Sequence, residues 1–221
     1  MQTTWDKVDE YFVEHLSLSD DVLDAALGDS TAAGLPAINV TPAQGKFLAF
    51  LASMCRARRI LEIGTLGGYG TIWMARALPA DGTLITLEID SNAAAVAERN
   101  LERAGVAKRA KVMVGRAAES LSRLIADKVK PFDLVFIDAD KQNSTVYFEA
   151  TLALSHPGTV IIVDNVVREG AITDEFSTDT NVLGMRQLTE WLANESRVSA
   201  TAIQTVGSKG YDGFIMALVN P

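Results

Sequence analysis

The chain has 221 residues, of which 48% are hydrophobic and 22% are charged, and its formal net charge at pH 7 is −8. This length suffices for one domain with a sizeable core, and the apolar fraction excludes a disordered chain. An acidic chain with scattered Lys and Arg residues is a poor candidate for binding a nucleic-acid backbone. No run of roughly 18 or more apolar residues is present, so we expect no membrane-spanning helix, and the N-terminal segment lacks the pattern of a signal peptide.

The sequence has one cysteine, Cys55, and two histidines, His15 and His156. A single cysteine excludes an internal disulfide and fits a reducing cytoplasm, and the apolar run FLAFLASMC predicts that the Cys55 thiol is buried and unreactive. We expect His15 in an N-terminal helix and His156 in a turn before Pro157, both with structural roles. This scarcity of histidine excludes His-based metal sites and most His-based catalytic triads.

The segment up to Met54 is expected to be helical. Residues 5–33 have the pattern of one or two amphipathic helices. Thr41 followed by Pro42 is typical of a helix start, because threonine caps the helix and proline is tolerated at its first position. This helix should run to Met54.

From residue 59 onward, strands and helices alternate. Strands are expected at residues 59–63, 83–88, 110–115, 132–138, 159–164, 198–206 and 213–219, and helices at residues 69–78, 91–104, 118–127, 144–155 and 178–195. Alternation of this kind implies a mainly parallel sheet with helices on both faces, and the nearly all-apolar strands LVFID and VIIVD fit such coverage. The last two strands follow one another without a helix, which indicates an antiparallel hairpin.

The predicted fold class is therefore α/β: a doubly wound, mainly parallel seven-stranded sheet with a C-terminal antiparallel hairpin and extra N-terminal helices. We expect residues 1–221 to form a single domain, with residues 1–40 as a helical cover and residues 41–221 as the core that carries the site. In open sheets of this kind, ligands bind beyond the carboxyl ends of the strands.

The first predicted strand runs into the glycine-rich stretch LEIGTLGGYG, residues 61–70. Glycines such as Gly64, Gly68 and Gly70 let a backbone approach a ligand without a Cβ in the way. The spacing differs from the dinucleotide pattern G-x-G-x-x-G, and an acid at Glu62 favours a ligand that carries positive charge. The alternative is a tight strand–helix turn with no ligand.

Two further strand ends suit a nucleoside. Glu88 lies 24 residues after Gly64, near the spacing at which an acid binds ribose hydroxyls in nucleotide-binding α/β folds. Asp90 directly precedes a helix and is expected to cap it. The small residues around Ala117, in the exit Gly115-Arg116-Ala117, suit a flat adenine ring.

Two predicted neighbouring strands end in oxygen-bearing side chains, Asp138 after one and Asp164-Asn165 after the other. Two carboxylates and an amide oxygen, with no His or Cys, make a site for a hard cation, and Mg²⁺ fits best. Lys141 lies three residues past Asp138 and is a candidate general base. The alternatives are that the acids cap helices and that the lysine is a solvated surface charge.

The motifs LEIGTLGGYG, LEID, FDLVFIDADK and VIIVDN together resemble those of the class I S-adenosylmethionine-dependent O-methyltransferases, most of all bacterial members of the cation-dependent catechol and caffeoyl-coenzyme A type. The resemblance covers residues 40–219. It implies a Rossmann-like methyltransferase fold and transfer of a methyl group from S-adenosylmethionine to a hydroxyl of a small aromatic vicinal diol, such as a catechol, caffeoyl or flavonoid-like compound. The diol would be held on Mg²⁺ or another hard divalent cation such as Mn²⁺ or Ca²⁺. It also implies a cytoplasmic homodimer, with no nucleic-acid or membrane partner.

The resemblance implies roles for particular residues. Cofactor contacts are expected from Val40, Glu62, Gly64, Thr65, Gly68, Gly70, Glu88, Ala117, Asp138 and Asp140. Asp138, Asp164 and Asn165 would hold the metal ion, and Lys141 would be the catalytic base, with Asp138 as the second catalytic residue.

The sequence departs from the family pattern at three positions. Gly70 stands where many relatives have Ser, Ser144 where relatives often have Tyr, and Val206 where the animal catechol enzymes have Glu. We therefore expect an acceptor pocket that differs from a simple catechol site. The alternatives are a NAD-type dehydrogenase, a methyltransferase acting on RNA or another non-catechol acceptor, and a non-catalytic binding protein.

Overall fold

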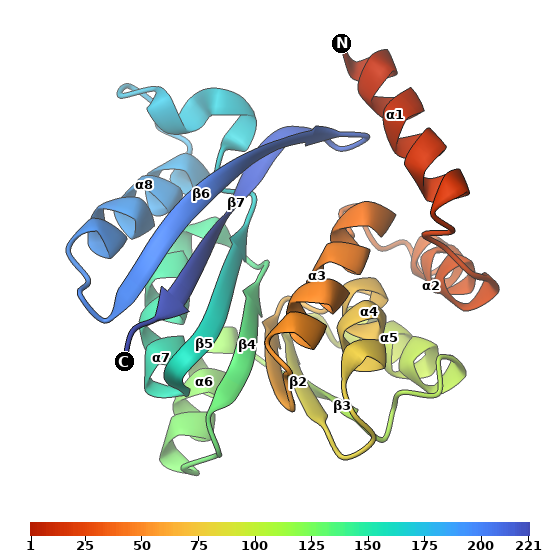
Figure 1. Ribbon diagram of the computed structural model, residues 1–221, viewed down its shortest axis with the longest axis horizontal. Coiled ribbons are helices and arrows are strands. Elements are labelled where there is room, and N and C mark those ends of the chain that lie inside the picture. The colour runs from red at the N-terminus through yellow and green to blue at the C-terminus, as the bar shows by residue number, and fades with distance from the viewer.

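Seven strands form one sheet in the computed structural model, which describes residues 1–221 (Figure 1). They are β1 (Arg59–Ile63), β2 (Thr83–Glu88), β3 (Ala110–Val114), β4 (Phe132–Ile137), β5 (Ser155–Asp164), β6 (Val198–Gly207) and β7 (Gly210–Val219). The spatial order is β3-β2-β1-β4-β5-β7-β6. The first five strands pair in parallel, whereas β7 is antiparallel to both β5 and β6. The predicted α/β class and the antiparallel C-terminal hairpin are confirmed.

Eight α-helices and two short 3₁₀ helices complete the fold. They are α1 (Gln2–His15), α2 (Asp21–Ala32), α3 (Pro42–Met54), α4 (Tyr69–Ala77), α5 (Ser91–Arg103), α6 (Ala117–Ala126), η1 (Lys141–Asn143), α7 (Ser144–Ala153), η2 (Arg168–Thr173) and α8 (Thr180–Ala193). The segment 5–33 thus forms two helices. None of the helices is long and apolar enough to cross a membrane.

The sheet separates two hydrophobic cores because successive strand residues point to opposite faces. On one face, Ile60 and Phe136 pack with residues of α2, α3, α4 and α5. On the other face, Leu61 and Val135 pack with residues of α6, α7 and α8. Figure 1 shows these two groups of helices on either side of the strands. The buried character of the central strands follows from this double coverage.

The predicted helix boundaries rest on caps that the structure contains. Thr41 accepts a hydrogen bond from the backbone N–H of Gln44 at 3.2 Å, and Pro42 is the first residue of α3. Asp90 accepts from the backbone N–H of Asn92 at 2.7 Å, which confirms it as the N-cap of α5. Each cap satisfies an N–H group that has no partner inside its helix.

Two expectations about single residues are wrong. His156 lies within β5 and not in a turn. Ser155 of this strand pairs with Phe132, and the regular register resumes at Val160. Residues 156–159 therefore form an irregularity inside the strand. Proline and glycine inside a strand are typical of such bulges. Cys55 is half-buried and not buried, since it is the residue that ends α3.

Helix α8 packs closely against η1, which carries Lys141. A Cβ added at Gly184 of α8 would overlap the carbonyl oxygen of Lys141 and lie 2.6 Å from the Cα of Gln142. Both obstructing atoms belong to the backbone and have no side-chain freedom to move away. The glycine therefore permits the contact between the helix and the segment that positions the lysine.

We predict that Gly184→Ala lowers the free energy of unfolding by about 1–3 kcal/mol, because overpacking against backbone outweighs the helix propensity gained. Gly28→Ala is the matched control, since Gly28 also lies within a helix and a Cβ there meets nothing within 4 Å. This control should gain about 0.5–1 kcal/mol. Urea unfolding of both variants measures their free energies of unfolding. Equal stabilisation of Gly184→Ala and Gly28→Ala would contradict close packing at Gly184.

Candidate functional site

A cavity of about 730 Å³ lies at the carboxyl ends of the parallel strands. Most of the residues predicted for the site line it: Val40, Glu62, Gly64, Thr65, Gly70, Glu88, Ala117, Asp138, Asp140, Lys141 and Asn165. Two predicted residues, Gly68 and Asp164, are not among its lining residues. A Cβ at Gly68 would lie 3.2 Å from atoms of Ala97, so this glycine permits α4 to pack on α5. Asp164 is nearly buried, with 5% of its surface exposed.

The end of β1 comes very close to the end of β4. Gly64 has a φ of +100°, and a Cβ there would overlap the carbonyl oxygen of Asp138. The backbone N–H of Asp138 donates to the carbonyl of Ile63 at 2.8 Å. Glycine is needed here for both its backbone conformation and its lack of a side chain. This close approach brings Asp138 to the same part of the cavity as the glycine-rich loop.

Glu62 is a buried acid at the floor of the cavity, with 1% of its surface exposed. Its Oε2 accepts a hydrogen bond from the hydroxyl of Thr71 at 2.5 Å. Burial raises the pKa of Glu62 to about 8, although the hydroxyls of Thr71 and Thr86 lower it. A Cβ at Gly70 would lie 3.3 Å from Glu62 Oε1, so a glycine at this position leaves space next to the acid.

Glu88 holds the glycine-rich loop in place. Its Oε2 accepts from the backbone N–H of Leu66 at 2.8 Å and of Thr65 at 3.1 Å, and its Oε1 accepts from Asp90 N at 2.9 Å. Leu66 has a φ of +49°, a conformation that a leucine rarely adopts without such support. A carboxylate offers about four acceptor positions, so Glu88 retains capacity for a ligand.

Asp140 is bonded to a residue that sequence reasoning did not assign. The hydroxyl of Tyr147 donates to Asp140 Oδ1 at 2.6 Å. Burial and the Asp140 carboxylate both raise the pKa of Tyr147, which keeps this phenol protonated as a donor. Tyr147 and Asp140 both line the cavity. The tyrosine therefore fixes the orientation of the acid.

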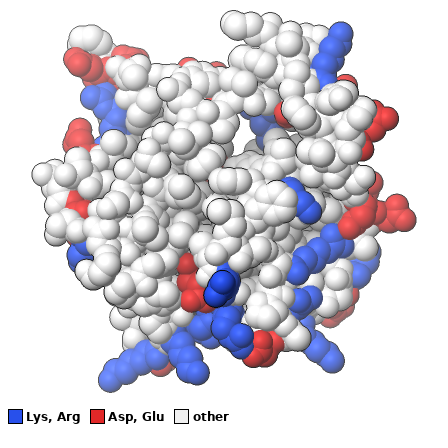
Figure 2. All heavy atoms as spheres, viewed as in Figure 1, with Lys and Arg blue, Asp and Glu red and all other residues white.

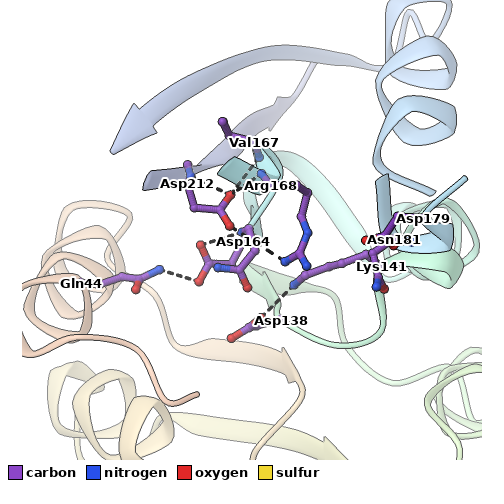
Figure 3. Close-up of polar contacts among 11 residues, drawn as sticks. Gln44, Asp138, Lys141, Asp164, Val167, Arg168, Asp179, Asn181 and Asp212 are labelled. Atoms are coloured by element: carbon purple, nitrogen blue, oxygen red, sulfur yellow. Dashed lines mark hydrogen bonds and ion pairs between the residues drawn. The ribbon is translucent and has the colours of Figure 1, made fainter. Parts of the chain in front are cut away.

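Asp138 and Lys141 form a nearly buried ion pair (Figure 3). Lys141 Nζ donates to Asp138 Oδ1 at 2.9 Å, and only 6% of the lysine surface is exposed. The 3₁₀ turn η1 returns the chain so that residues three apart in the sequence meet. This geometry excludes the alternative that the lysine is a solvated surface charge.

Asp164 lies on the neighbouring strand at the same level. Ile137 and Val163 are paired residues of β4 and β5, and Asp138 and Asp164 are the next residues of the two strands. Burial and the charge of Asp138 raise the pKa of Asp164 to about 7, and Lys141 lowers it. The charge of Asp138 therefore acts against ionisation of the buried Asp164.

The side chain of Gln44, from α3, donates to Asp164 Oδ2 at 2.6 Å. The backbone N–H of Asn165 donates to Asp164 Oδ1 at 2.9 Å. Asp164 therefore does not cap a helix, as one alternative held. Gln44 was not identified from the sequence, because 120 residues separate it from Asp164 and no local motif marks it.

The donor atoms around Asp164 suit a hard cation. Asn165 lines the cavity, has a φ of +54°, and makes no side-chain hydrogen bond within the protein. The structure contains no group of three or more His, Cys, Asp or Glu side chains that could hold a metal ion. The ligand set expected from the sequence includes two acids, Asp138 and Asp164, and its third member is the side-chain amide of Asn165. Oxygen donors and two mutually repelling carboxylates match the preference of Mg²⁺.

Asp212, on β7, fixes the turn that follows Asn165. Its Oδ1 accepts from the backbone N–H groups of Val167 at 2.9 Å, Arg168 at 3.0 Å and Gly213 at 3.0 Å. The backbone N–H of Val166 also donates to the carbonyl of Gly213 at 3.0 Å. A side chain from the C-terminal hairpin thereby holds the segment that carries Asn165, as Figure 3 shows.

Two of the departures from the family pattern lie away from the cavity surface. Ser144 is buried, with 1% exposure, at the start of α7. Val206 is 54% exposed on β6 and is not among the residues that line the cavity. Only Gly70 of the three lines the cavity.

The chain has an α/β fold with its cavity at the carboxyl ends of the parallel strands. This is where proteins with open sheets of this kind bind their ligands. The O-methyltransferase family profile matches residues 14–218 of the chain. The chain is 49% identical over 215 residues to the catechol O-methyltransferase of Niastella koreensis. The alignment covers 97% of each of the two proteins.

Solved structures agree with this match. An O-methyltransferase from Bacillus cereus in complex with SAH is 54% identical, superposes with a TM-score of 0.98 and covers 100% of both chains. The O-methyltransferase TomG from Streptomyces achromogenes, involved in tomaymycin synthesis and solved in complex with SAM, is 48% identical with a TM-score of 0.96, over 100% of this chain and 99% of that one. The chain belongs to the O-methyltransferase family. This membership disfavours the NAD-type dehydrogenase alternative.

The raised pKa of Glu62 predicts a pH-dependent cost to stability. The folded protein binds the Glu62 proton more tightly than the unfolded chain, so this group lowers stability as pH rises from about 4.5 to about 8. We predict that Glu62→Gln, without ligand, has a melting temperature similar to that of the wild-type protein near pH 4.5 and a higher one at pH 8. Differential scanning fluorimetry across this range measures the difference. If the difference in melting temperature between Glu62→Gln and wild type shrinks as pH rises, Glu62 is not a buried, protonated acid.

Proposed function

We propose that the protein transfers a methyl group from S-adenosylmethionine to one hydroxyl of a small aromatic vicinal diol held by a divalent cation. The observation that carries this proposal is the meeting of Asp138, Lys141, Asp164 and Asn165 at the ends of two adjacent strands. The names and ligands of the similar proteins support the donor and the class of acceptor.

The cofactor fits the half of the cavity formed by β1, β2 and β3. Glu88 would accept hydrogen bonds from the ribose hydroxyls, and the adenine would lie against Ala117. Glu62 is the buried acid available to the cofactor's ammonium group, and its negative charge would then have a partner. Bound cofactor supplies a methyl group on a positively charged sulfur.

Backbone groups would complete the cofactor site. Val40, Gly64, Thr65 and Gly70 all line the cavity, with Asp140 at the end of β4. Because Gly70 has no hydroxyl, its backbone N–H near the start of α4 is the group that can bind the cofactor's carboxylate. At Gly70 a backbone N–H would therefore bind the cofactor's carboxylate in place of a side-chain hydroxyl.

The acceptor fits the half formed by β4 and β5. A divalent cation bound to Asp138, Asp164 and Asn165 would favour the ionised form of an acceptor hydroxyl. A cation on Asp138 would compete for the carboxylate that pairs with the Lys141 ammonium and so favour loss of its proton to solvent. The neutral amine would then take the acceptor's proton at Nζ, oriented by its hydrogen bond with Asp138. The buried setting of the lysine limits the access of water to this step.

The N-terminal helices fit the role of a cover within the single domain. Asp9 of α1 accepts a hydrogen bond from the backbone N–H of Ser208 at the tip of the β6–β7 hairpin, at 2.7 Å. Ser30, Ile38 and Asn39 line the cavity. Residues 1–40 would thus enclose the cavity together with the hairpin.

We also propose a homodimer. Figure 2 shows a white expanse over the middle-left and upper part of the face on which α3 and β6 lie toward the reader in Figure 1, with charged side chains gathered along its lower part and its edges. Large exposed hydrophobic residues lie on these elements and on β7, namely Phe47, Phe50, Met54, Ile203, Val206 and Leu218. Exposed apolar patches of this kind mark interaction surfaces, and a second copy is the occupant that the proposal names.

The cation requirement tests the proposed function. We predict that the protein methylates catechol with S-adenosylmethionine and Mg²⁺, and that excess EDTA abolishes turnover while cofactor binding persists. Mass spectrometry of the product and calorimetric titration of the cofactor give the two readouts. Full activity in EDTA would refute the role of the cation, and restoration by added Mg²⁺ is the control for nonspecific inhibition.

Replacing the proposed base should affect the chemical step alone. We predict that Lys141→Met lowers kcat by about 100-fold or more, because a general base typically contributes that factor. The Kd of the cofactor should change by less than about threefold, since Lys141 is linked to the proposed cofactor contacts only through its hydrogen bond with Asp138. Lys46→Met, a lysine of α3 near Phe50 and Trp73, is a matched control that should leave kcat intact. Equal kcat values for Lys141→Met and wild type would exclude Lys141 as the base.

A further inference from the structure

Arg168 has a guanidinium group that makes no hydrogen bond in the protein. Its side chain is 32% exposed, it lines the cavity, and its Nε is fully buried without a partner. Its one ion pair is with Asp212, whose Oδ2 lies 4.0 Å from Nη1, beyond hydrogen-bond distance. A partly buried charge without hydrogen bonds is costly, so such a group normally has a ligand or a partner.

The fold holds this arginine in a conformation that it does not readily adopt. Arg168 has a φ of +55°, and the adjacent Glu169 has a φ of +56°. The hydrogen bonds from the Val167 and Arg168 backbones to Asp212 Oδ1 maintain this turn. Strained backbone of this kind persists only where the surrounding structure enforces it, and it is common at ligand sites. Asp212 therefore positions Arg168 through its backbone and faces its guanidinium at 4.0 Å without a hydrogen bond.

The acids of the acceptor half are already engaged. Asp138 pairs with Lys141, and Asp164 accepts from Gln44 and its own neighbour Asn165. In Figure 3 the Arg168 side chain extends toward Lys141 in the same part of the cavity. A neutral diol bound there would leave the arginine with no charged partner except Asp212, at 4.0 Å and without a hydrogen bond.

A second cation lies at this end of the molecule. Lys209, at the tip of the β6–β7 hairpin, donates only to the backbone carbonyl of Ala37, at 3.0 Å. Partial burial lowers the pKa of Lys209, and the charges of Asp138 and Asp164 act in the opposite direction. No carboxylate of the protein pairs with Lys209.

We propose that Arg168 is a specificity-determining residue that binds a carboxylate carried by the acceptor, so that the preferred acceptors are vicinal aromatic diols bearing an acid group. This inference rests on the proposed function and adds to it the charge of the substrate. A guanidinium matches the geometry of a carboxylate with two parallel N–H donors, which a lysine cannot reproduce. Lys209 adds long-range attraction for the same anion.

The cofactor's own carboxylate is the competing ligand for Arg168. The proposed cofactor contacts are at the ends of β1, β2 and β3 and at Asp138 and Asp140 after β4, whereas Arg168 follows Asn165 at the end of β5. The acceptor half of the cavity is therefore the nearer one. Cofactor affinity separates the two assignments.

The test compares one pair of acceptors, 3,4-dihydroxybenzoate and 3,4-dihydroxybenzamide, in wild type and in Arg168→Gln. Both enzymes meet the same two compounds, so the intrinsic reactivity of each compound cancels in the comparison. We expect Arg168→Gln to lower kcat/KM for the benzoate by about 10- to 100-fold, with a change of less than about threefold for the benzamide. Arg168→Lys should restore part of the preference. Arg99→Gln, which removes the charge of an exposed arginine on α5, is the control for net charge.

Calorimetric titration of each variant supplies a readout that does not depend on turnover. The Kd of 3,4-dihydroxybenzoate should rise in Arg168→Gln, whereas the Kd of S-adenosylmethionine should stay within about twofold of wild type. An equal loss for benzoate and benzamide, or a weakened affinity for the cofactor, would overturn the assignment while the proposed function stands. Failure of the wild-type protein to methylate any diol with Mg²⁺ would instead overturn the proposed function, and this inference with it.

Discussion

The repulsion between the buried carboxylate of Asp164 and the partly exposed carboxylate of Asp138 is the interaction on which the site depends. Parallel pairing of β4 and β5 brings these acids to the same level of the sheet edge, and burial of Asp164 limits the screening of its charge by water. An ammonium from η1 and an amide from α3 offset part of this cost. A divalent cation would offset the rest, which is why the proposed reaction depends on one.

Much of the surrounding structure serves to hold this arrangement. Gly64 lets β1 approach the backbone of Asp138, and Gly184 lets α8 approach the backbone of Lys141. Asp212 secures the turn after Asn165 from the C-terminal hairpin. Residues from opposite ends of the chain therefore determine the position of groups near the middle. Substitutions far from the cavity in sequence should consequently affect the reaction.

The two halves of the cavity differ in their chemistry. The half next to β1 and β2 offers acids and backbone groups at Glu62 and Glu88, as a cofactor with ribose hydroxyls and an ammonium group requires. In the half next to β4 and β5, Lys141 and Arg168 lie near Asp138 and Asp164. Transfer of a methyl cation equivalent between the halves would combine a positively charged donor with an ionised acceptor. Exclusion of water favours such a step.

The sequence predicted the sheet and most of the strand-end residues that line the cavity, because both depend on local patterns. Apolar strands, the caps Thr41 and Asp90, and acids at strand ends are visible within a few residues of one another. Interactions between distant segments were not visible. Gln44 meets Asp164 across 120 residues, and no local pattern marks a glutamine for that role.

Two other misses have physical causes. The bulge that keeps His156 within β5 involves a proline and a glycine, which in sequence look like a turn. The position of the Arg168 guanidinium, which makes no hydrogen bond, depends on how Asp212 of a neighbouring strand holds its backbone, and no local sequence pattern marks that relation. Such residues are found only once the chain is folded.

The position of the cation is the most direct test of this mechanism. A crystal grown with the cofactor and soaked in MnCl₂ allows manganese to be located by its anomalous scattering. The mechanism predicts one strong peak within about 2.5 Å of side-chain oxygens of Asp138, Asp164 and Asn165. A soaked crystal with no peak at these residues, or with a peak only elsewhere on the protein, would contradict it.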